Sequence, residues 1–364
     1  MPTLLDPITL GDYQLKNRIF MAPLTRGRSG SKGVPSKMVA DYYAQRADAG
    51  LLIAEATAVN SQGHGWRNAP AIYTDDQVAG WRRVTDAVHA NGGRIFVQIW
   101  HMGWTVLPEF ANGRRPVAPS EVKAEGGLRG KDGQRRDFVT PRAMTFTEIE
   151  DTIADFVRAA EGAIEAGFDG VEIHAANGFL LDSFLRDGTN LRQDRYGGSV
   201  ENRARILIEV VEAVTRAIGS GKVGVRFSPT HDVFGVDDSE PSVTFPRIAV
   251  MLDRFDLAYL HILEAKPSSG SPFATDIAPV AARIRDAYGG VLIMNGGYSF
   301  DSANDALDAG EADAIAFGVH FIANPDLVDR FRRGLPLSQP DPDTYYTPGR
   351  RGYSDYQPYL AAAA

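Results

Sequence analysis

The stretch Gly170-Val-Glu-Ile-His174 sets the pattern of the whole chain: a short, mostly apolar run that ends in a polar side chain. Such a run is typical of a parallel strand that is covered by helices on one face and by a barrel interior on the other. A segment of helical periodicity, Thr147 to Ala166, precedes it, and a second one, Val200 to Ile218, follows it. The stretch therefore indicates one unit of an alternating β/α fold.

The same alternation recurs eight times along the chain. We predict strands at Ile19 to Ala22, Leu51 to Glu55, Ile95 to Ile99, Gly170 to His174, Val223 to Phe227, Ala258 to Ile262, Val291 to Met294 and Ala314 to Phe317. We predict helices at Ser36 to Ala49, Asp75 to Asn91, Thr147 to Ala166, Val200 to Ile218, Val243 to Phe255, Ala274 to Ala287, Asp301 to Ala309 and Pro325 to Arg333. Thr147 and Glu150 have the spacing of a capping box at one helix start. Eight β/α units in series predict an α/β fold, a single (β/α)8 TIM barrel.

Two segments do not follow this β/α alternation. The connection 101–146, after the third strand, has no helical period, and we expect a β-hairpin excursion that partly caps the barrel mouth. The segment 335–364 is rich in Pro, Tyr and Asp, and we expect this C-terminal tail to fold over the barrel. Both belong to one domain, residues 1–364.

Composition excludes several classes of protein. The chain has 364 residues, a net charge of −8 and no cysteine, so disulfides, thiolate metal sites and iron–sulfur clusters are excluded. Basic residues are scattered, which argues against nucleic acid or an anionic membrane as a partner. We predict a cytoplasmic monomer or homodimer that acts on a small-molecule substrate, with no metal site and no membrane attachment.

In (β/α)8 enzymes the catalytic groups stand at the carboxyl ends of the strands. Polar side chains at those ends in this chain are Thr25, Glu55, Thr57, Gln98, His101, His174, Asn177 and Arg226. If the chain makes a helical turn after His174, then His174 and Asn177 project from one face and converge on one acceptor. Such a pair would polarise a carbonyl or nitro oxygen. Alternatively, His174 is an interior histidine whose hydrogen bonds are made within the protein, and Asn177 forms a turn.

Other residues at these ends also allow two interpretations. Gly296-Gly297 and Gly318 follow the last two strands, where barrel enzymes often bind a phosphate, but they also suit turns that need positive φ. Arg226 needs a buried partner, either an anionic ligand or a carboxylate such as Glu55 or Glu172. Gln98 suits the edge of a heterocycle, or it is a buried polar filler.

The chain resembles the Old Yellow Enzyme family of FMN-dependent NADH:flavin oxidoreductases, over nearly its whole length. Five stretches carry the resemblance: Lys16-Asn-Arg-Ile-Phe-Met-Ala-Pro-Leu-Thr-Arg26, Val97-Gln-Ile-Trp-His101, His174-Ala-Ala-Asn-Gly178, Asn190-Leu-Arg-Gln-Asp-Arg-Tyr-Gly-Gly-Ser-Val-Glu-Asn-Arg203 and Phe321-Ile-Ala-Asn-Pro-Asp-Leu327. The last two are long and specific.

The resemblance implies one FMN at the barrel mouth. Around its ring system it implies Pro23, Leu24, Thr25, Ala56, Gln98 and Arg226, with the Thr25 hydroxyl near the C4 carbonyl and Arg226 beside N1. Around its phosphate it implies Asn295, Gly296, Gly297, Phe317, Gly318 and Val319. Trp66, Trp100, Phe179 and Tyr353 match positions that line the substrate pocket.

The function implied is that of an ene-reductase working by a ping-pong mechanism. NAD(P)H reduces FMN and leaves, and an α,β-unsaturated carbonyl or nitroalkene then binds with its oxygen held by His174 and Asn177. Nitro compounds and nitrate esters are further candidate substrates. Hydride passes to the β-carbon and a proton to the α-carbon.

The chain departs from the family at two positions. Phe179 stands where the family usually has a tyrosine that donates the proton, so we expect water or another hydroxyl, such as that of Tyr353, to supply it. Val319 stands where the family usually has an arginine on the phosphate, so we expect weaker FMN retention unless His320 or another cation compensates.

Two alternatives differ in class from an ene-reductase. A glycoside hydrolase would need two opposed carboxylates, for which Glu55 and Glu264 are the candidates. A non-catalytic flavin-binding protein would explain the missing proton donor.

Overall fold

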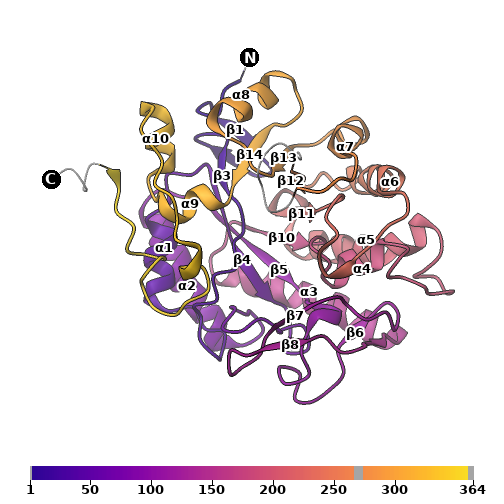
Figure 1. Cartoon of the computed structure of the whole chain (residues 1–364). Coiled ribbons are helices and arrows are strands. Elements are labelled where there is room, and N and C mark those ends of the chain that lie inside the picture. The colour runs from indigo at the N-terminus through magenta and orange to yellow at the C-terminus, as the bar shows by residue number, and fades with distance from the viewer. Residues whose placement is uncertain (1, 266–273, 360–364) are drawn as a thin grey trace.

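Eight parallel strands close into a barrel in the computed structural model, which describes residues 2–265 and 274–359. The strands are β3 (Ile19–Met21), β4 (Leu51–Ala58), β5 (Ile95–Trp100), β10 (Gly170–His174), β11 (Val223–Phe227), β12 (Tyr259–Leu263), β13 (Leu292–Asn295) and β14 (Ala314–Phe317). Each pairs with the next along the chain, and β14 pairs with β3, with β10 beside β5 (Figure 1). The predicted (β/α)8 barrel is confirmed.

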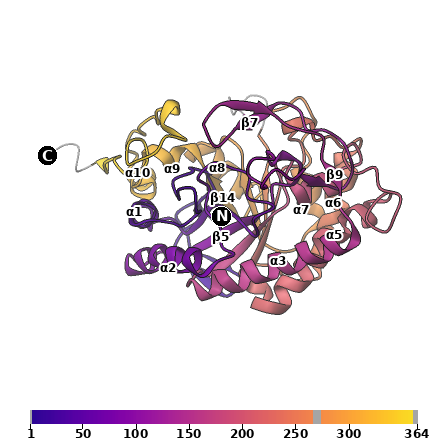
Figure 2. The same ribbon diagram turned by 90° about the horizontal axis from the view of Figure 1, so that it is seen from below.

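Helices cover the outside of the barrel (Figure 2). Eight of them correspond to the predicted ones: α1 (Lys37–Ala44), α2 (Asp75–Ala90), α3 (Phe146–Glu165), α5 (Val200–Ile218), α6 (Pro241–Asp253), α7 (Ala281–Ala287), α8 (Phe300–Asp308) and α10 (Leu327–Arg333). The short helices α4 (Leu180–Leu185) and α9 (Val319–Ala323) were not predicted, because one or two turns show no clear periodicity. Within residues 2–265 and 274–359, no helix has both the length and the apolar character needed to cross a membrane.

The start of α3 corrects one prediction. Thr145, not Thr147, is the N-cap, and its side chain accepts a hydrogen bond from the backbone N–H of Glu148. Glu148 bonds back to Thr145, which completes the capping box two residues earlier than Thr147 and Glu150 suggested. Both pairs have the right spacing, and only the extended backbone of Thr145 (φ −74°, ψ 164°) distinguishes them.

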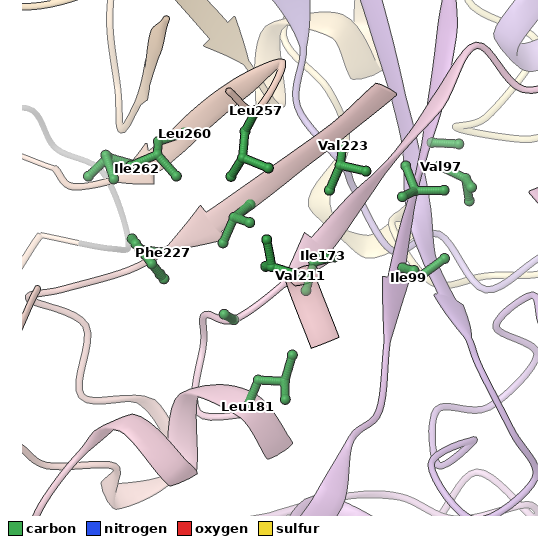
Figure 3. Packing of buried hydrophobic residues seen from close by; sticks show 14 of the residues in the cluster. Val97, Ile99, Ile173, Leu181, Val211, Val223, Phe227, Leu257, Leu260 and Ile262 are labelled. Carbon is green, nitrogen blue, oxygen red and sulfur yellow. The ribbon is translucent and has the colours of Figure 1, made fainter. Parts of the chain in front are cut away.

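The main core lies between the barrel and its helices. Figure 3 shows strand residues Val97, Ile99, Ile173 and Val223 packed in this layer, together with Val211 of α5. Because successive side chains of a strand point to opposite faces, the residues between these face the barrel interior. The outward packing of the apolar residues thus fixes which polar residues point inward.

A hairpin that the sequence did not reveal packs with the residues inside the barrel. β1 (Ile8–Leu10) and β2 (Tyr13–Leu15) pair antiparallel, and Leu10 and Leu15 pack with the inward-facing Phe20 and Phe96. Three-residue strands are too short to show an alternating pattern.

The connection 101–146 contains two small sheets. β7 (Gly127–Arg129) pairs antiparallel with β8 (Arg135–Asp137), and β6 (Val117–Ala118) pairs parallel with β9 (Arg142–Ala143). The connection reaches the loop after β11, where Phe138 packs edge-on against Phe234 with ring centroids 5.3 Å apart.

The C-terminal tail is tied to the loop after β3. Arg26 donates to the carbonyl oxygens of Tyr345 and Gly352, and Arg28 donates to those of Thr344 and Gly349. Residues 360–364 of the predicted tail lie outside the described residues.

Candidate functional site

A chain of buried polar groups crosses the interior of the barrel. Gln98 lies between the outward-facing Val97 and Ile99, so it faces inward, and its Nε2 donates to Glu172 Oε1 over 2.7 Å. Glu172 Oε2 lies 2.8 Å from Nδ1 of His261. Burial raises the pKa of Glu172, but His261 and Arg226 outweigh this effect and lower the pKa below its usual value. The carboxylate is therefore a fixed negative charge inside the barrel.

Arg226 is the cation that faces this charge. Its Nη2 donates to Asn295 Oδ1 over 2.8 Å, and Asn295 Nδ2 donates to the carbonyl oxygen of Ala316. Burial lowers the pKa of Arg226, and Glu172 partly offsets this. Within the described residues, the Nε of Arg226 is buried without a hydrogen-bond partner. Of the two carboxylates suggested by the sequence, Glu172 is thus the one that acts on Arg226, and one N–H of the guanidinium remains available to a ligand.

His174 stands beside Arg226 in the register of β10 and β11 and belongs to an aromatic cluster. Its ring lies parallel to that of Trp100, at 7° and 6.0 Å between centroids. Phe179 packs edge-on against His174 at 5.2 Å and against Trp100 at 4.6 Å. Burial, Arg226 and His261 hold the pKa of His174 well below its usual value, so the imidazole is neutral. Its Nδ1 is buried and has no partner in the part of the chain that the structure describes.

Asn177 does not lie in a helical turn, so that part of the prediction is wrong. Its backbone is left-handed (φ 58°), as is that of Gly178 (φ 72°), and α4 begins only at Leu180. Asparagine and glycine tolerate this conformation better than other residues. The Asn177 N–H donates to Ser228 Oγ over 2.7 Å. The tight turn, rather than helical spacing, brings residue 177 back to the end of β11.

His231 is a site residue that sequence reasoning missed. Its Nδ1 lies 3.3 Å from Oδ1 of Asn177. It follows β11 by four residues, so a search for polar residues at the strand ends could have found it if it had continued past Arg226.

The predicted pocket residues separate into two groups. Trp66, Trp100 and Phe179 belong to one apolar cluster, which also contains Ala56. Tyr353 is elsewhere: it is fully buried and stacks on Tyr42, with centroids 4.0 Å apart and planes 8° apart.

Two guanidinium groups complete the surroundings of Tyr353. Arg28 lies over its ring at 4.4 Å, and Arg26 at 5.2 Å. Its ring contacts in the described residues are therefore with Tyr42 and these arginines, and none is with His174 or Phe179.

The loop Pro23, Leu24 and Thr25 follows β3 and adjoins the end of β14. A Cβ on Gly318 would lie 3.3 Å from Leu24 Cδ2, so loop and strand end are in close contact. Thr25 is partly exposed. The two predicted binding segments thus meet at one side of the barrel mouth.

The glycines after β13 have their own structural reason. Gly296 (φ 146°) and Gly297 (φ 86°) both have positive φ, and a Cβ on Gly296 would lie 2.2 Å from the carbonyl oxygen of Glu264. These glycines are required by the backbone whether or not a phosphate binds. Gly318 differs, because its φ is −97°.

Neither of the two side chains that begin α9 adds a positive charge to the predicted phosphate end. Val319, the first residue of α9, is 43% exposed. His320 contacts Phe317 at 6.2 Å between ring centroids, and burial lowers its pKa. A neutral His320 does not replace the missing arginine.

Comparison with known proteins decides the family. Residues 3–338 match the NADH:flavin oxidoreductase / NADH oxidase family. The chain belongs to this family. It is 42% identical to a chanoclavine-I aldehyde reductase of Penicillium roqueforti, over 98% of this chain and 96% of that protein. It is 40% identical to a probable flavin mononucleotide-dependent alkene reductase of Leishmania infantum, over 97% of this chain and 96% of that one. The solved Old Yellow Enzyme homologue of Zymomonas mobilis is 46% identical, with a TM-score of 0.95 over 98% of this chain and 99% of that one.

As a member of this family, the chain is an NAD(P)H-dependent oxidoreductase that acts on C=C bonds with FMN as its cofactor. The glycoside hydrolase alternative is wrong. Its two candidate carboxylates bind backbone instead: Glu55 accepts from the N–H groups of Arg26 and Gly27, and Glu264 accepts from those of Val280 and Ala281. The non-catalytic alternative is also set aside by the family assignment.

Proposed function

We propose that the chain reduces the activated C=C bond of α,β-unsaturated carbonyls and nitroalkenes, with nitro compounds and nitrate esters as further substrates, in a ping-pong reaction with NAD(P)H. One observation carries the proposal. His174 and Arg226 are neighbours across β10 and β11, and both face the barrel interior. Each has a buried ring or guanidinium nitrogen that finds no partner among residues 2–265 and 274–359. Buried polar groups are rarely left unpaired, so these nitrogens indicate a ligand.

The residues present fit FMN. Arg226 supplies a buried positive charge for the electron-rich side of the ring system, and Gln98 donates its amide N–H to Glu172, which leaves its carbonyl oxygen to accept from a heterocycle N–H. Bound FMN supplies the two-electron transfer between the nicotinamide and the substrate double bond. We assign the ring system to Pro23, Leu24, Thr25, Ala56, Gln98 and Arg226, and the phosphate to Asn295, Gly296, Gly297, Phe317, Gly318 and Val319. The side-chain amide of Asn295 is held by Arg226 and by the carbonyl oxygen of Ala316, which fixes its orientation beside the predicted site.

The substrate oxygen is assigned to His174 and Asn177. A neutral imidazole and a carboxamide donate hydrogen bonds without adding charge, and such bonds strengthen as negative charge develops on the oxygen. Trp66, Trp100 and Phe179 supply an apolar wall of the substrate pocket, and the Thr25 hydroxyl adds a hydrogen bond at the ring system.

We assign the proton to water. Phe179 has no proton to give, and the Tyr353 hydroxyl belongs to a ring packed against Tyr42 and the two arginines. Burial and Glu55 raise the pKa of Tyr353 well above its usual value, which makes it a poorer acid.

An absorbance spectrum of the purified protein tests the function. We expect a flavin spectrum that NADPH bleaches under anaerobic conditions and that cyclohexenone then restores. A colourless protein, or a bleached protein that cyclohexenone does not reoxidise, would contradict the proposal.

A further inference from the structure

The segment directly after β11 holds Asn177 by two separate contacts. Ser228 Oγ accepts from the backbone N–H of Asn177 at 2.7 Å, and His231 Nδ1 lies 3.3 Å from its side-chain Oδ1. The first contact fixes where residue 177 is. The second acts on the amide that we assign to the substrate oxygen.

This segment is itself held rigidly. Arg186 donates to the carbonyl oxygen of Ser228 over 2.6 Å and pairs with Asp182 over 2.8 Å, and both charged side chains are buried. Asp182 in turn accepts from the N–H of Gly178 over 2.8 Å. One buried ion pair therefore ties the turn that carries Asn177 to the segment that carries His231.

The chemistry of the two atoms determines which of them donates in the contact between His231 and Asn177. An amide oxygen only accepts, so a hydrogen bond between His231 Nδ1 and Asn177 Oδ1 requires the proton on Nδ1. Burial, followed by the charge of Arg186, lowers the pKa of His231 to about 4, so the imidazole is neutral near pH 7 and has a single N–H. With Oδ1 bound in this way, the NH2 group of Asn177 is left to donate elsewhere. With the amide reversed, Oδ1 would face the substrate oxygen and repel it.

We propose that His231 is a positioning residue that donates to Asn177 Oδ1 and thereby presents the Asn177 NH2 group to the substrate oxygen. This role rests on the proposed function of Asn177. It concerns substrate binding and leaves the assignment of the FMN site unchanged.

Two substitutions of His231, by asparagine and by the isosteric aspartate, test the proposal. In His231→Asn the new amide can still donate, and we expect kcat/KM for cyclohexenone to stay within about threefold of the wild type. In His231→Asp the carboxylate only accepts, so it holds the Asn177 NH2 group and turns Oδ1 toward the substrate. We expect kcat/KM to fall about 10- to 100-fold, and cyclohexenone binding to the oxidised protein, followed by the flavin absorbance, to weaken in parallel.

The same substitution in an Asn177→Ala background distinguishes positioning from general damage. If His231 acts through Asn177, His231→Asp costs less than about threefold there. His231→Leu, which removes the donor without adding charge, follows the same pattern if the Asp variant fails to fold. Equal losses of kcat/KM in both backgrounds, or a loss in His231→Asn as large as in His231→Asp, would overturn the positioning role of His231. Such results would leave the proposed function of the chain intact. A wild type that reduces no enone would overturn the proposed function as well.

Discussion

The indole of Trp100 and the imidazole of His174 lie parallel, with 7° between the ring planes and 6.0 Å between the centroids. Phe179 packs edge-on against both rings, at 4.6 Å from Trp100 and 5.2 Å from His174. All three side chains are buried. The Nδ1 of the neutral His174 has no partner in the described residues, and its ring is held between these two aromatic side chains.

This packing makes Phe179→Tyr a test of the proton source. If water already delivers the proton, an added hydroxyl changes the rate of flavin reoxidation by a strongly activated enone by less than about threefold in single turnovers. A gain approaching the roughly 100- to 10,000-fold that a positioned acid contributes would show that protonation by water limits the wild type. Phe179→Leu is the control, because it removes the ring that packs against His174 without adding a hydroxyl.

The sequence predicted the barrel and its inward-facing polar residues for a simple reason. Side chains alternate along strands, so the apolar Val97 and Ile99 fix the direction of Gln98 between them. The orientation of Asn177 could not be predicted in this way, because it depends on two left-handed residues and on contacts with a segment more than 50 positions later.

Tyr353 shows the same limit. Nothing in the sequence around Tyr353 indicated that its ring would stack on Tyr42. The tail is held by arginines that donate to its backbone carbonyls, and such contacts leave no pattern in the side chains of the tail. The capping box of α3 was misplaced because two threonines two residues apart both offered the right spacing.

Val319→Arg tests whether a cation at position 319 strengthens FMN binding. A charge-assisted hydrogen bond contributes about 1.5 to 3 kcal/mol, and partial exposure of position 319 favours the low end. We therefore expect the dissociation constant for FMN, measured by equilibrium release of flavin fluorescence, to fall about tenfold. Val319→Leu should leave it unchanged. FMN retention in Val319→Arg no tighter than in the wild type would contradict the prediction.

Arg28→Met tests how the tail is held. Arg28 is buried and donates to several backbone carbonyls of the tail, including those of Thr344 and Gly349. Its loss should release this segment, so trypsin should cleave after the exposed Arg350 faster than in the wild type. Substitution of the exposed Arg67 by Met provides the control. An unchanged rate of cleavage at the tail would mean that the other contacts suffice.

His101 predicts a specific pH dependence of stability. Burial lowers its pKa to about 3 from 6.5, while its Nδ1 accepts from the N–H of Gly103. The unfolded chain therefore binds more protons than the folded one between these values, so the free energy of unfolding falls as the pH drops below 6.5. Between pH 7.5 and pH 5.0 this group alone removes about 2 kcal/mol.

His101→Asn isolates that contribution, because the asparagine oxygen can still accept from Gly103 but does not titrate. Urea unfolding at saturating FMN, at pH 7.5 and pH 5.0, should show the wild type losing about 2 kcal/mol more than the variant on acidification. Other titrating groups are common to both proteins and cancel in this difference. His231→Asn should reduce the loss in a similar way, since the pKa of His231 is also lowered, to about 4. If His101→Asn and the wild type lose the same amount, His101 is protonated in the folded protein at pH 5.0, and burial alone does not keep it neutral.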